Sequence, residues 1–385
     1  MERSQQAECI VGVSVGNTGA GYIEQRNLLS LPFRNVTLGR EYDVVGGLNY
    51  VQRKLRGNPP ATSFLNTIHW NPLRRRFNLL HLVNSISASS TPWISTFSHY
   101  LPRWNMISRF GMSLLAGKAC RKLIAISAFA FAYEEALIDP HPMYREAIRQ
   151  KLVVLHPAQP ALIPSFEVKE LDRDAVVCTI VGADFFRKGG MEILRATERL
   201  ARQGYPIRLN IVSSLDAGDY ASHAGGEEVR QAERMIAGLP GVVRHYRSLP
   251  NDKVLTMFKN SHVGLLPTYD DIYGYSVLEA QAAGCPVIST DICALPEINN
   301  DEIGWMIRVP KDSFGIAFRK RDAQRKRLSR EIEEQLFTHL RSICDNPGIA
   351  MDKGRRALAR ITAECRPEDR SAALERIYGE AMSAG

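Results

Sequence analysis

Residues 262–297 read HVGLLPTYDDIYGYSVLEAQAAGCPVISTDICALPE, and this stretch decides the fold. The pattern predicts a buried strand, a loop, a helix that opens on a glycine, a second strand and a Pro-Glu turn. Short apolar strands that alternate with helices are typical of a parallel sheet covered on both faces. Ligands of such sheets bind at the carboxyl ends of the strands.

Two carboxylates in this stretch lie where such a ligand would bind. Asp271 is expected in the loop, and Glu279 about one turn into the helix. Between them, a helix start would direct free backbone N–H groups at an anion. The residues at that start are Gly274, Tyr275 and Ser276. A carboxylate suited to a ribose, beside N–H groups suited to a phosphate, predicts a nucleotide site.

The composition is that of a globular protein. The chain has 385 residues, of which 45% are hydrophobic and 23% charged, and this length suffices for two domains. No apolar run approaches the roughly 20 residues of a transmembrane helix, and the polar N-terminus lacks a signal-peptide core. Seven scattered cysteines without CxxC spacing predict reduced thiols, a cytoplasmic location and no metal site.

Positive charge is concentrated in the N-terminal half. The net charge is +8, and residues 1–156 contain 18 Lys and Arg against 9 Asp and Glu. Dense basic clusters lie at 53–56 and 74–76. One interpretation is a solvated face that aids solubility, and the other is peripheral contact with an anionic membrane. Basic and aromatic residues do not interleave, so no nucleic-acid partner is expected.

Strands and helices alternate on both sides of a seam at 156–174, which contains three prolines. Strands are expected at 9–15, 79–83, 92–97, 122–126, 152–155, 176–181, 207–212, 263–266 and 287–290. Helices are expected from about residue 22 and at 190–202, 227–237, 252–260, 276–283, 330–344, 350–363 and 367–384. This order predicts an N-terminal domain at 1–165, a second domain at 166–365, and a C-terminal helix at 366–385 that crosses back to the first.

A second loop adds cations to the predicted nucleotide site. The strand expected at 176–181 runs into GADFFRKGG at 182–190, just before a helix. Arg187 and Lys188 would hold a diphosphate there through charge-assisted hydrogen bonds, each worth roughly 1.5–3 kcal/mol. Because a Lys-Gly before a helix is also common loop chemistry, the prediction depends on both loops lying on the same edge of the sheet.

Together these motifs resemble the retaining glycosyltransferases of the GT4 family. The similarity covers 176–307 and is carried by VGADFFRKGG at 181–190, HYRSLPNDKVLTMFKNSHVGLLPTYDD at 245–271 and GYSVLEAQAAGCPVIS at 274–289. It implies an α/β fold of the GT-B type, in which two Rossmann-like, doubly wound parallel-sheet domains face each other across an interdomain cleft. It also implies a nucleotide diphosphate sugar as donor and no separate cofactor.

The resemblance assigns roles to three charged residues. Glu279 matches the glutamate that hydrogen-bonds the ribose, and Lys188 matches the lysine that holds the diphosphate. Asp271 stands where the family has a glutamate that contacts the donor sugar. Aspartate keeps the charge but is one methylene shorter, so sugar choice or geometry would differ. The family's arginine, five residues before the lysine, is Ala183 here, and Arg187 is the candidate to replace it.

Backbone groups of two further segments have implied roles. The amides of Gly274, Tyr275 and Ser276 match the loop that caps the distal phosphate. Ser248 and Leu249 fall in the turn that lies near the base.

Candidates in the N-terminal half are fewer. Gly19 and Gly21 resemble the family's glycine loop before the first helix, although turn geometry explains them equally well. His99 lies one position beyond the place where many members carry a histidine near the sugar, and a structural histidine is the alternative. Asn84 is a candidate for binding acceptor hydroxyls, and His81 is interpreted first as a strand-end residue.

The implied reaction is metal-independent transfer of a hexose-type sugar with retained configuration. The acceptor would be a growing glycan or its lipid-linked precursor, as in polysaccharide biosynthesis. Catalysis would consist of electrostatic stabilisation and positioning. Two alternatives stay open: a non-catalytic scaffold of the same fold, suggested by Ala183 and Asp271, and a basic membrane or nucleic-acid adaptor.

Overall fold

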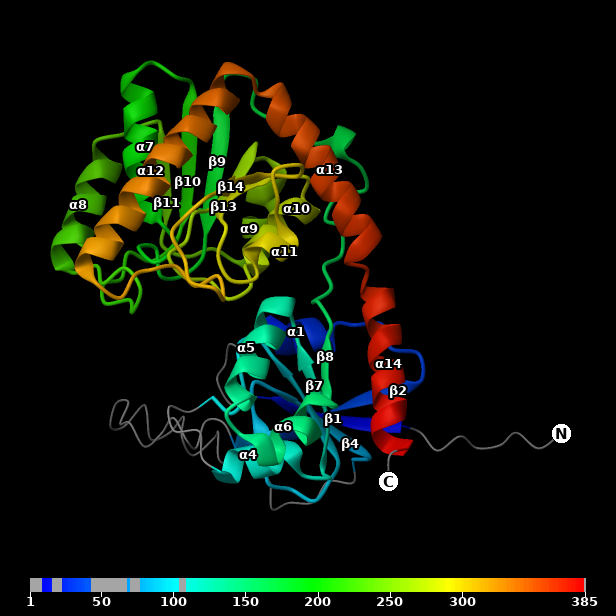
Figure 1. The fold of residues 1–385 in the computed structure, drawn as a ribbon. Coiled ribbons are helices and arrows are strands. Elements are labelled where there is room, and N and C mark those ends of the chain that lie inside the picture. The colour runs from blue at the N-terminus through cyan, green and yellow to red at the C-terminus, as the bar shows by residue number, and fades with distance from the viewer. Residues whose placement is uncertain (1–8, 16–22, 43–67, 70–76, 104–108, 384–385) are drawn as a thin grey trace. The chain divides into compact units, whose positions relative to one another are not determined.

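The computed structural model describes residues 9–15, 23–42, 68–69, 77–103 and 109–383. The chain forms two compact units, one made of Met1–Ala158 with Cys365–Gly385 and the other of Gln159–Glu364 (Figure 1). The predicted boundary at 165/166 therefore lies too late in the sequence. The reason is that Leu162 N–H donates to the carbonyl of Ala282 at 2.8 Å, and Ile163 and Phe166 pack on Leu358.

The first unit contains a six-stranded parallel sheet with the order β2-β1-β4-β6-β7-β8. Its strands are β1 (Cys9–Val15), β2 (Val36–Tyr42), β4 (Leu79–Val83), β6 (Trp93–Phe97), β7 (Cys120–Ala125) and β8 (Leu152–Val154), and β3 (Ile68–His69) pairs with β5 (Ile86–Ser87) in a small second sheet. The strand order reverses between β1 and β4.

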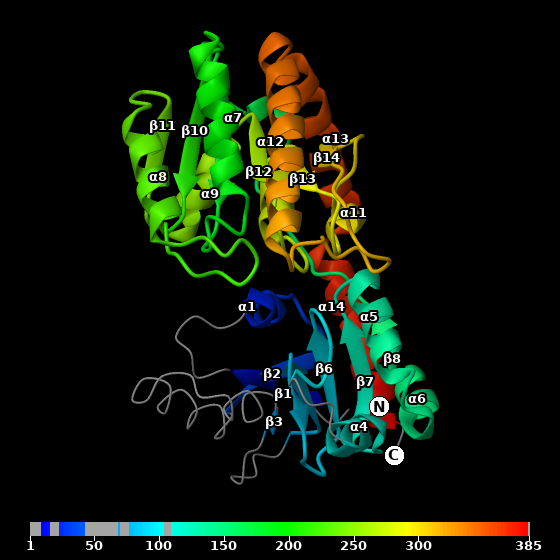
Figure 2. The same cartoon turned by 60° about the vertical axis from the view of Figure 1, so that its left-hand side comes forward.

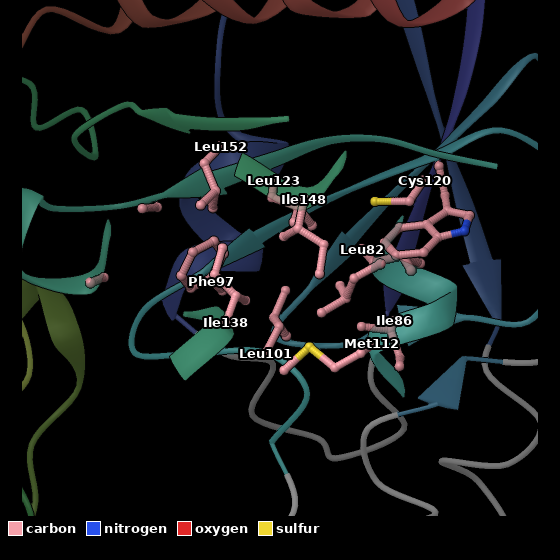
Figure 3. Close-up of a cluster of buried hydrophobic side chains, with 14 of the residues drawn as sticks. Leu82, Ile86, Phe97, Leu101, Met112, Cys120, Leu123, Ile138, Ile148 and Leu152 are labelled. Atoms are coloured by element: carbon pink, nitrogen blue, oxygen red, sulfur yellow. The ribbon is translucent and has the colours of Figure 1, made fainter. Parts of the chain in front are cut away.

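Helices cover both faces of this sheet. They are α1 (Ile23–Leu29), α4 (Arg109–Ala116), α5 (Ala128–Ile138), α6 (Pro142–Arg149) and α14 (Pro367–Ser383). On one face, side chains from strands and from α4, α5 and α6 form a buried apolar cluster that includes Leu82, Phe97, Met112, Ile138 and Ile148 (Figure 3). Burying each such side chain contributes about 1.5–3 kcal/mol.

The C-terminal helix α14 covers the other face of the same sheet. Leu374 and Tyr378 of this helix pack with Val11 and Ile94. His81 of β4 joins the helix to the sheet, because its Nδ1 lies 2.7 Å from Tyr378 Oη and its Nε2 lies 2.7 Å from Thr96 Oγ1. Burial, together with the charge of Arg370, lowers the pKa of His81 to about 3. His81 is therefore a neutral, buried residue within β4 rather than a strand-end residue.

The second unit has a six-stranded parallel sheet with the order β11-β10-β9-β12-β13-β14. Its strands are β9 (Val176–Val181), β10 (Ile207–Val212), β11 (Val243–Tyr246), β12 (Val263–Leu266), β13 (Val287–Thr290) and β14 (Trp305–Ile307). This is the 3-2-1-4-5-6 order of the doubly wound fold, and the strand order reverses between β9 and β12.

Helices also cover both faces of the second sheet. They are α7 (Gly190–Arg202), α8 (Gly226–Ala237), α9 (Asn251–Lys259), α10 (Tyr275–Ala282), α11 (Leu295–Ile298), α12 (Asp322–Asp345) and α13 (Gly348–Glu364), with a short 3₁₀ turn at Phe166–Val168. The long helix α12 lies beside α7 (Figure 2). Arg199 of α7 stacks on Phe337 of α12, with Cζ 3.7 Å from the ring centroid.

Two expectations from composition can be compared with the described residues. None of the helices described is long and apolar enough to cross a membrane. Of the six cysteines whose side chains the structure describes, five are buried and one is half-buried, and all six are free thiols. The basic clusters at 53–56 and 74–76 lie outside the described residues, so their predicted membrane contact stays a prediction.

Candidate active site

The loops that follow β9 and β12 meet at the point where the strand order of the second sheet reverses. The carbonyl oxygen of Arg187 accepts hydrogen bonds from Tyr269 N–H at 2.8 Å and from Thr268 Oγ1 at 3.0 Å. These bonds join the 182–189 loop to the 267–274 loop. In doubly wound sheets, this crevice outside the strand ends is where ligands bind.

Lys188 and Asp271 form an ion pair between these two loops. Lys188 Nζ lies 3.0 Å from Asp271 Oδ2, and the side chains are 12% and 16% exposed. Burial alone would raise the pKa of Asp271, but the charge and hydrogen bond of Lys188 outweigh it, so the pKa lies below its usual range. The structure therefore brings these two predicted site residues together, with the carboxylate ionised.

The second oxygen of Asp271 fixes the start of α10. Asp271 Oδ1 accepts the N–H of Gly274 at 2.8 Å and that of Tyr273 at 3.3 Å. Gly274, with φ of 87°, is the residue that precedes the helix. A Cβ at this position would lie 2.5 Å from Leu295 Cδ2, so glycine is required there.

The first turn of α10 follows directly. The N–H groups of Tyr275 and Ser276 lie in this turn, where the N–H groups of a helix point along its axis towards the preceding loop. The positive end of the helix dipole adds to their attraction for an anion. Glu279 is one turn further along the same helix and is half-buried. The residues predicted to bind the diphosphate and the ribose thus lie on one short helix.

Gly182 makes room for the Lys188 side chain. A Cβ at residue 182 would lie 2.6 Å from Lys188 Cε and 3.2 Å from Lys188 Nζ, and Gly182 has φ of 130°. The lysine stem therefore crosses directly over the backbone at the end of β9. This close approach directs the ammonium group towards the β12 loop.

Arg187 braces the loops in the structure. Its guanidinium pairs with Asp184 at 2.7 Å and donates to the backbone carbonyl of Asp270. Its proposed role in holding the diphosphate stays a prediction.

Ser248 and Leu249 follow β11, two strands from β9. Ser248 is exposed, while Leu249 is half-buried and lines a pocket of about 700 Å³.

Two candidates of the first unit, Asn84 and His99, lie at the carboxyl ends of its strands. Asn84 follows β4 with φ of 53°, and its Oδ1 accepts the N–H of Ser98 at 2.9 Å, which ties together the ends of β4 and β6. His99 follows β6 and packs among three aromatic rings, those of Tyr100, Phe129 and Tyr133. Both residues have evident packing roles, and contact with a ligand stays a prediction. Gly19 and Gly21 lie outside the described residues.

One further carboxylate, which the sequence did not single out, organises this edge of the second sheet. Asp270 is 8% exposed, and its Oδ2 accepts Tyr220 Oη at 2.6 Å and Arg319 Nη2 at 2.7 Å. It thereby joins the loops that follow β10, β12 and β14. Its position beside Asp271 was the only signal in the sequence that could have identified it.

Residues 164–321 match the family model described as glycosyl transferases group 1. This segment contains the loops after β9 and β12 and the whole of α10. It is a group 1 glycosyltransferase domain. The resemblance to GT4-type glycosyltransferases that the sequence predicted is confirmed for this segment.

Curated relatives are about a quarter identical to this chain over the residues that align. A D-inositol 3-phosphate glycosyltransferase of Streptomyces avermitilis is 26% identical over 263 residues, which is 65% of this chain and 51% of that protein. The chain thus spans about half the length of this relative. An uncharacterised 41.2 kDa protein of a Klebsiella pneumoniae cps region is 27% identical over 106 residues, or 28% of this chain and 29% of that protein.

Solved glycosyltransferase structures share the fold over almost the whole chain. A Rickettsia africae glycosyltransferase has a TM-score of 0.61 at 12% identity and covers 98% of this chain and 99% of its own. Anabaena Alr3699/HepE, solved in complex with UDP, has a TM-score of 0.59 at 10% identity and covers 96% and 99%. The predicted GT-B fold is confirmed.

Proposed function

We propose that this protein transfers a hexose-type sugar from a nucleotide diphosphate sugar to a glycan or lipid-linked acceptor, with retained configuration. The observation that carries the proposal is the Lys188–Asp271 pair at the reversal point of the second sheet, beside the N-terminus of α10. A cation, a carboxylate and a helix start in one place match the parts of a nucleotide sugar.

Each part of the donor has a counterpart at this edge. The diphosphate would take Lys188 away from Asp271 and bind the amides of Tyr275 and Ser276. The carboxylate of Glu279 would accept hydrogen bonds from the ribose hydroxyls. Asp271, once released by the lysine, would face the sugar, where its negative charge stabilises the positive charge that develops at the anomeric carbon.

The proposed chemical step balances within the donor and the acceptor. The bond from the anomeric carbon to the phosphate oxygen breaks, and the acceptor oxygen bonds to that carbon on the same face. The acceptor proton passes to the departing phosphate oxygen. Lys188 and the first turn of α10 would carry the charge of the leaving group, so we expect no metal requirement in this step.

A nucleotide-release assay tests the proposal. The purified full chain is incubated with UDP- and GDP-sugars and a panel of glycan and lipid-linked acceptors, with and without a metal chelator. We expect acceptor-dependent release of UDP or GDP from one donor, and its loss in Glu279→Ala. Release that is absent with every donor would contradict the proposal and favour a non-catalytic member of the fold. Release that is unchanged in Glu279→Ala would contradict the proposed donor site.

Two observations bear on the class of acceptor. The curated relative from Klebsiella pneumoniae is described by its place in a cps region, and the first 156 residues carry the excess of positive charge. Both observations favour an anionic glycan or a lipid-linked acceptor at a membrane surface. Vesicles with and without anionic lipid distinguish the two, because only the lipid-linked case predicts that the rate rises with anionic lipid.

A further inference from the structure

Tyr220 presents its aromatic ring to solvent and turns its hydroxyl into the protein. The residue is 62% exposed, yet its Oη donates to Asp270 Oδ2 at 2.6 Å. Tyrosine side chains commonly bury the ring and leave the polar tip in water. Burial around the hydroxyl, followed by its hydrogen bond to Asp270, raises the pKa of Tyr220, so the hydroxyl remains a donor.

The backbone on both sides of Tyr220 is also fixed. Asp219 Oδ1 accepts the N–H groups of Ala221 at 2.9 Å and Ser222 at 2.6 Å. Across the base of the same loop, Gly218 N–H donates to the carbonyl of Ala224 at 2.9 Å. The ring is therefore held at its backbone end and at its hydroxyl end, and little conformational entropy remains to be lost on binding.

Arg187 supports one face of the ring. Its Cζ lies 5.9 Å from the ring centroid, within the range of a cation–π contact. Arg187 is itself held by Asp184. The 62% exposure of Tyr220 shows that much of the ring is still open to a ligand.

The ring stands next to the proposed diphosphate site. Its two partners, Asp270 and Arg187, are the chain neighbours of Asp271 and Lys188. The loop that carries Tyr220 follows β10, which lies between β9 and β11 in the sheet. In strand order, the loop that carries the ring thus lies between the loop after β9, which contains Lys188, and the turn at Ser248 and Leu249 that is expected near the base.

We propose that Tyr220 is the stacking platform for the nucleobase of the donor, an inference that rests on the proposed function. The base is the planar aromatic part of a nucleotide sugar, and it leaves water when it stacks on a fixed ring. Stacking is tolerant of base identity, because every base has a π-face. Tyr220 therefore supplies affinity for the nucleoside, and selection among bases falls to other groups.

Calorimetric titration of the full chain with UDP, GDP and inorganic diphosphate tests this role. Tyr220→Leu removes the ring, and Tyr220→Phe keeps the ring but removes its hydroxyl anchor. We expect Tyr220→Leu to weaken UDP and GDP binding about 5- to 140-fold, the range that base–aromatic stacking predicts at 1.4 kcal/mol per factor of ten. Tyr220→Phe should weaken the binding of UDP and GDP by a smaller factor. Inorganic diphosphate, which has no base, should bind both variants as it binds the unchanged protein.

Lys188→Ala separates failure of this inference from failure of the proposed function. If UDP and GDP bind Tyr220→Leu normally while Lys188→Ala loses them, the stacking role is overturned and the donor site stands. If Tyr220→Leu also loses inorganic diphosphate, Tyr220 acts through the loops rather than on the base, and the inference is again overturned. If Lys188→Ala binds all three ligands normally, the donor site itself is wrong.

Discussion

Lys188 Nζ lies 3.0 Å from Asp271 Oδ2, so the cation expected to bind the diphosphate is paired with the carboxylate expected to face the sugar. A diphosphate that binds the ammonium group would compete with this partner for its N–H donors. Asp271 is thus both a proposed catalytic residue and a competitor of the donor for Lys188.

Asp271→Asn should therefore separate binding from turnover. Removing the negative charge frees Lys188, so we expect UDP or GDP to bind roughly 2- to 10-fold more tightly. The same change removes the charge that would stabilise the transition state, so kcat should fall by about 10²- to 10³-fold. Calorimetry and initial rates measure the two effects. Weaker nucleotide binding in Asp271→Asn would show that the carboxylate does not compete for the lysine.

Gly182→Ala should disconnect Lys188 from the site without altering any charge. The added Cβ would lie 2.6 Å from Lys188 Cε, so the side chain must move away from Asp271. We expect nucleoside diphosphate affinity to fall about 10-fold or more, in line with the loss of one charge-assisted bond. Calorimetry provides the measurement.

Gly204→Ala is the matched control for that change. Gly204 also has positive φ, at 81°, but a Cβ there meets no atom within 4 Å, and the residue lies at the far end of α7. Both variants should lose similar stability, and only Gly182→Ala should lose affinity. An equal loss of affinity in the two would point to backbone strain rather than to Lys188.

His81 should make the first unit less stable as the pH falls. Its pKa is about 3 in the folded state against 6.5 in the unfolded state, so between these values only the unfolded state takes up the proton. Stability is complete above pH 6.5 and falls by about 1.4 kcal/mol for each pH unit below it. Hydrogen exchange of β4 and α14 peptides at pH 7.5 and 5.5 measures this difference.

His81→Asn gives the contrast for that experiment. The variant should be less stable at pH 7.5, because the hydrogen bonds of His81 to Tyr378 and Thr96 are lost. Between pH 7.5 and 5.5, however, its free energy of unfolding should fall by about 1.4 kcal/mol less than that of the unchanged protein. An identical pH dependence in both proteins would mean that His81 does not titrate on unfolding.

Arg319→Ala should loosen the loop cluster around Asp270. Arg319 Nη2 lies 2.7 Å from Asp270 Oδ2, and the side chains are 18% and 11% exposed. Leaving this carboxylate without its charged partner should cost about 1–3 kcal/mol of stability. Denaturant unfolding measures this loss of stability. The control is Arg321→Ala, at an exposed position two residues away, which should change stability by less than about 0.5 kcal/mol. Equal effects would show that the Arg319–Asp270 pair contributes no more than a surface charge.

The sequence predicts the strands best where short apolar runs stand between polar loops. Strands β1, β4, β9, β10, β12 and β13 have the predicted bounds. Five other strands were not foreseen. Three of them are very short: β3 and β5 have two residues each, and β14 has three. The other two are β2, whose sequence VTLGREY contains a glycine and two charges, and β11 (VRHY), which is polar at the sheet edge. Their strand state depends on pairing with neighbours, which local periodicity does not encode.

The candidate site likewise contains residues that could be placed from the sequence and residues that could not. Lys188 and Asp271 could be placed together from sequence because each follows a strand, and the strands are adjacent in a doubly wound order. Asp270, Tyr220 and Arg319 could not, because the bonds to Asp270 span 50 and 49 residues between irregular loops. Nothing in their spacing indicates which loops will touch. Only the three-dimensional packing shows that a buried carboxylate joins them.

The most direct test of the account is a crystal structure of the full chain with bound UDP or GDP. We expect the diphosphate to lie against Lys188 Nζ and the first turn of α10, with the Lys188–Asp271 pair broken and the ribose on Glu279. A nucleotide bound elsewhere, with that ion pair intact, would contradict the proposed donor site.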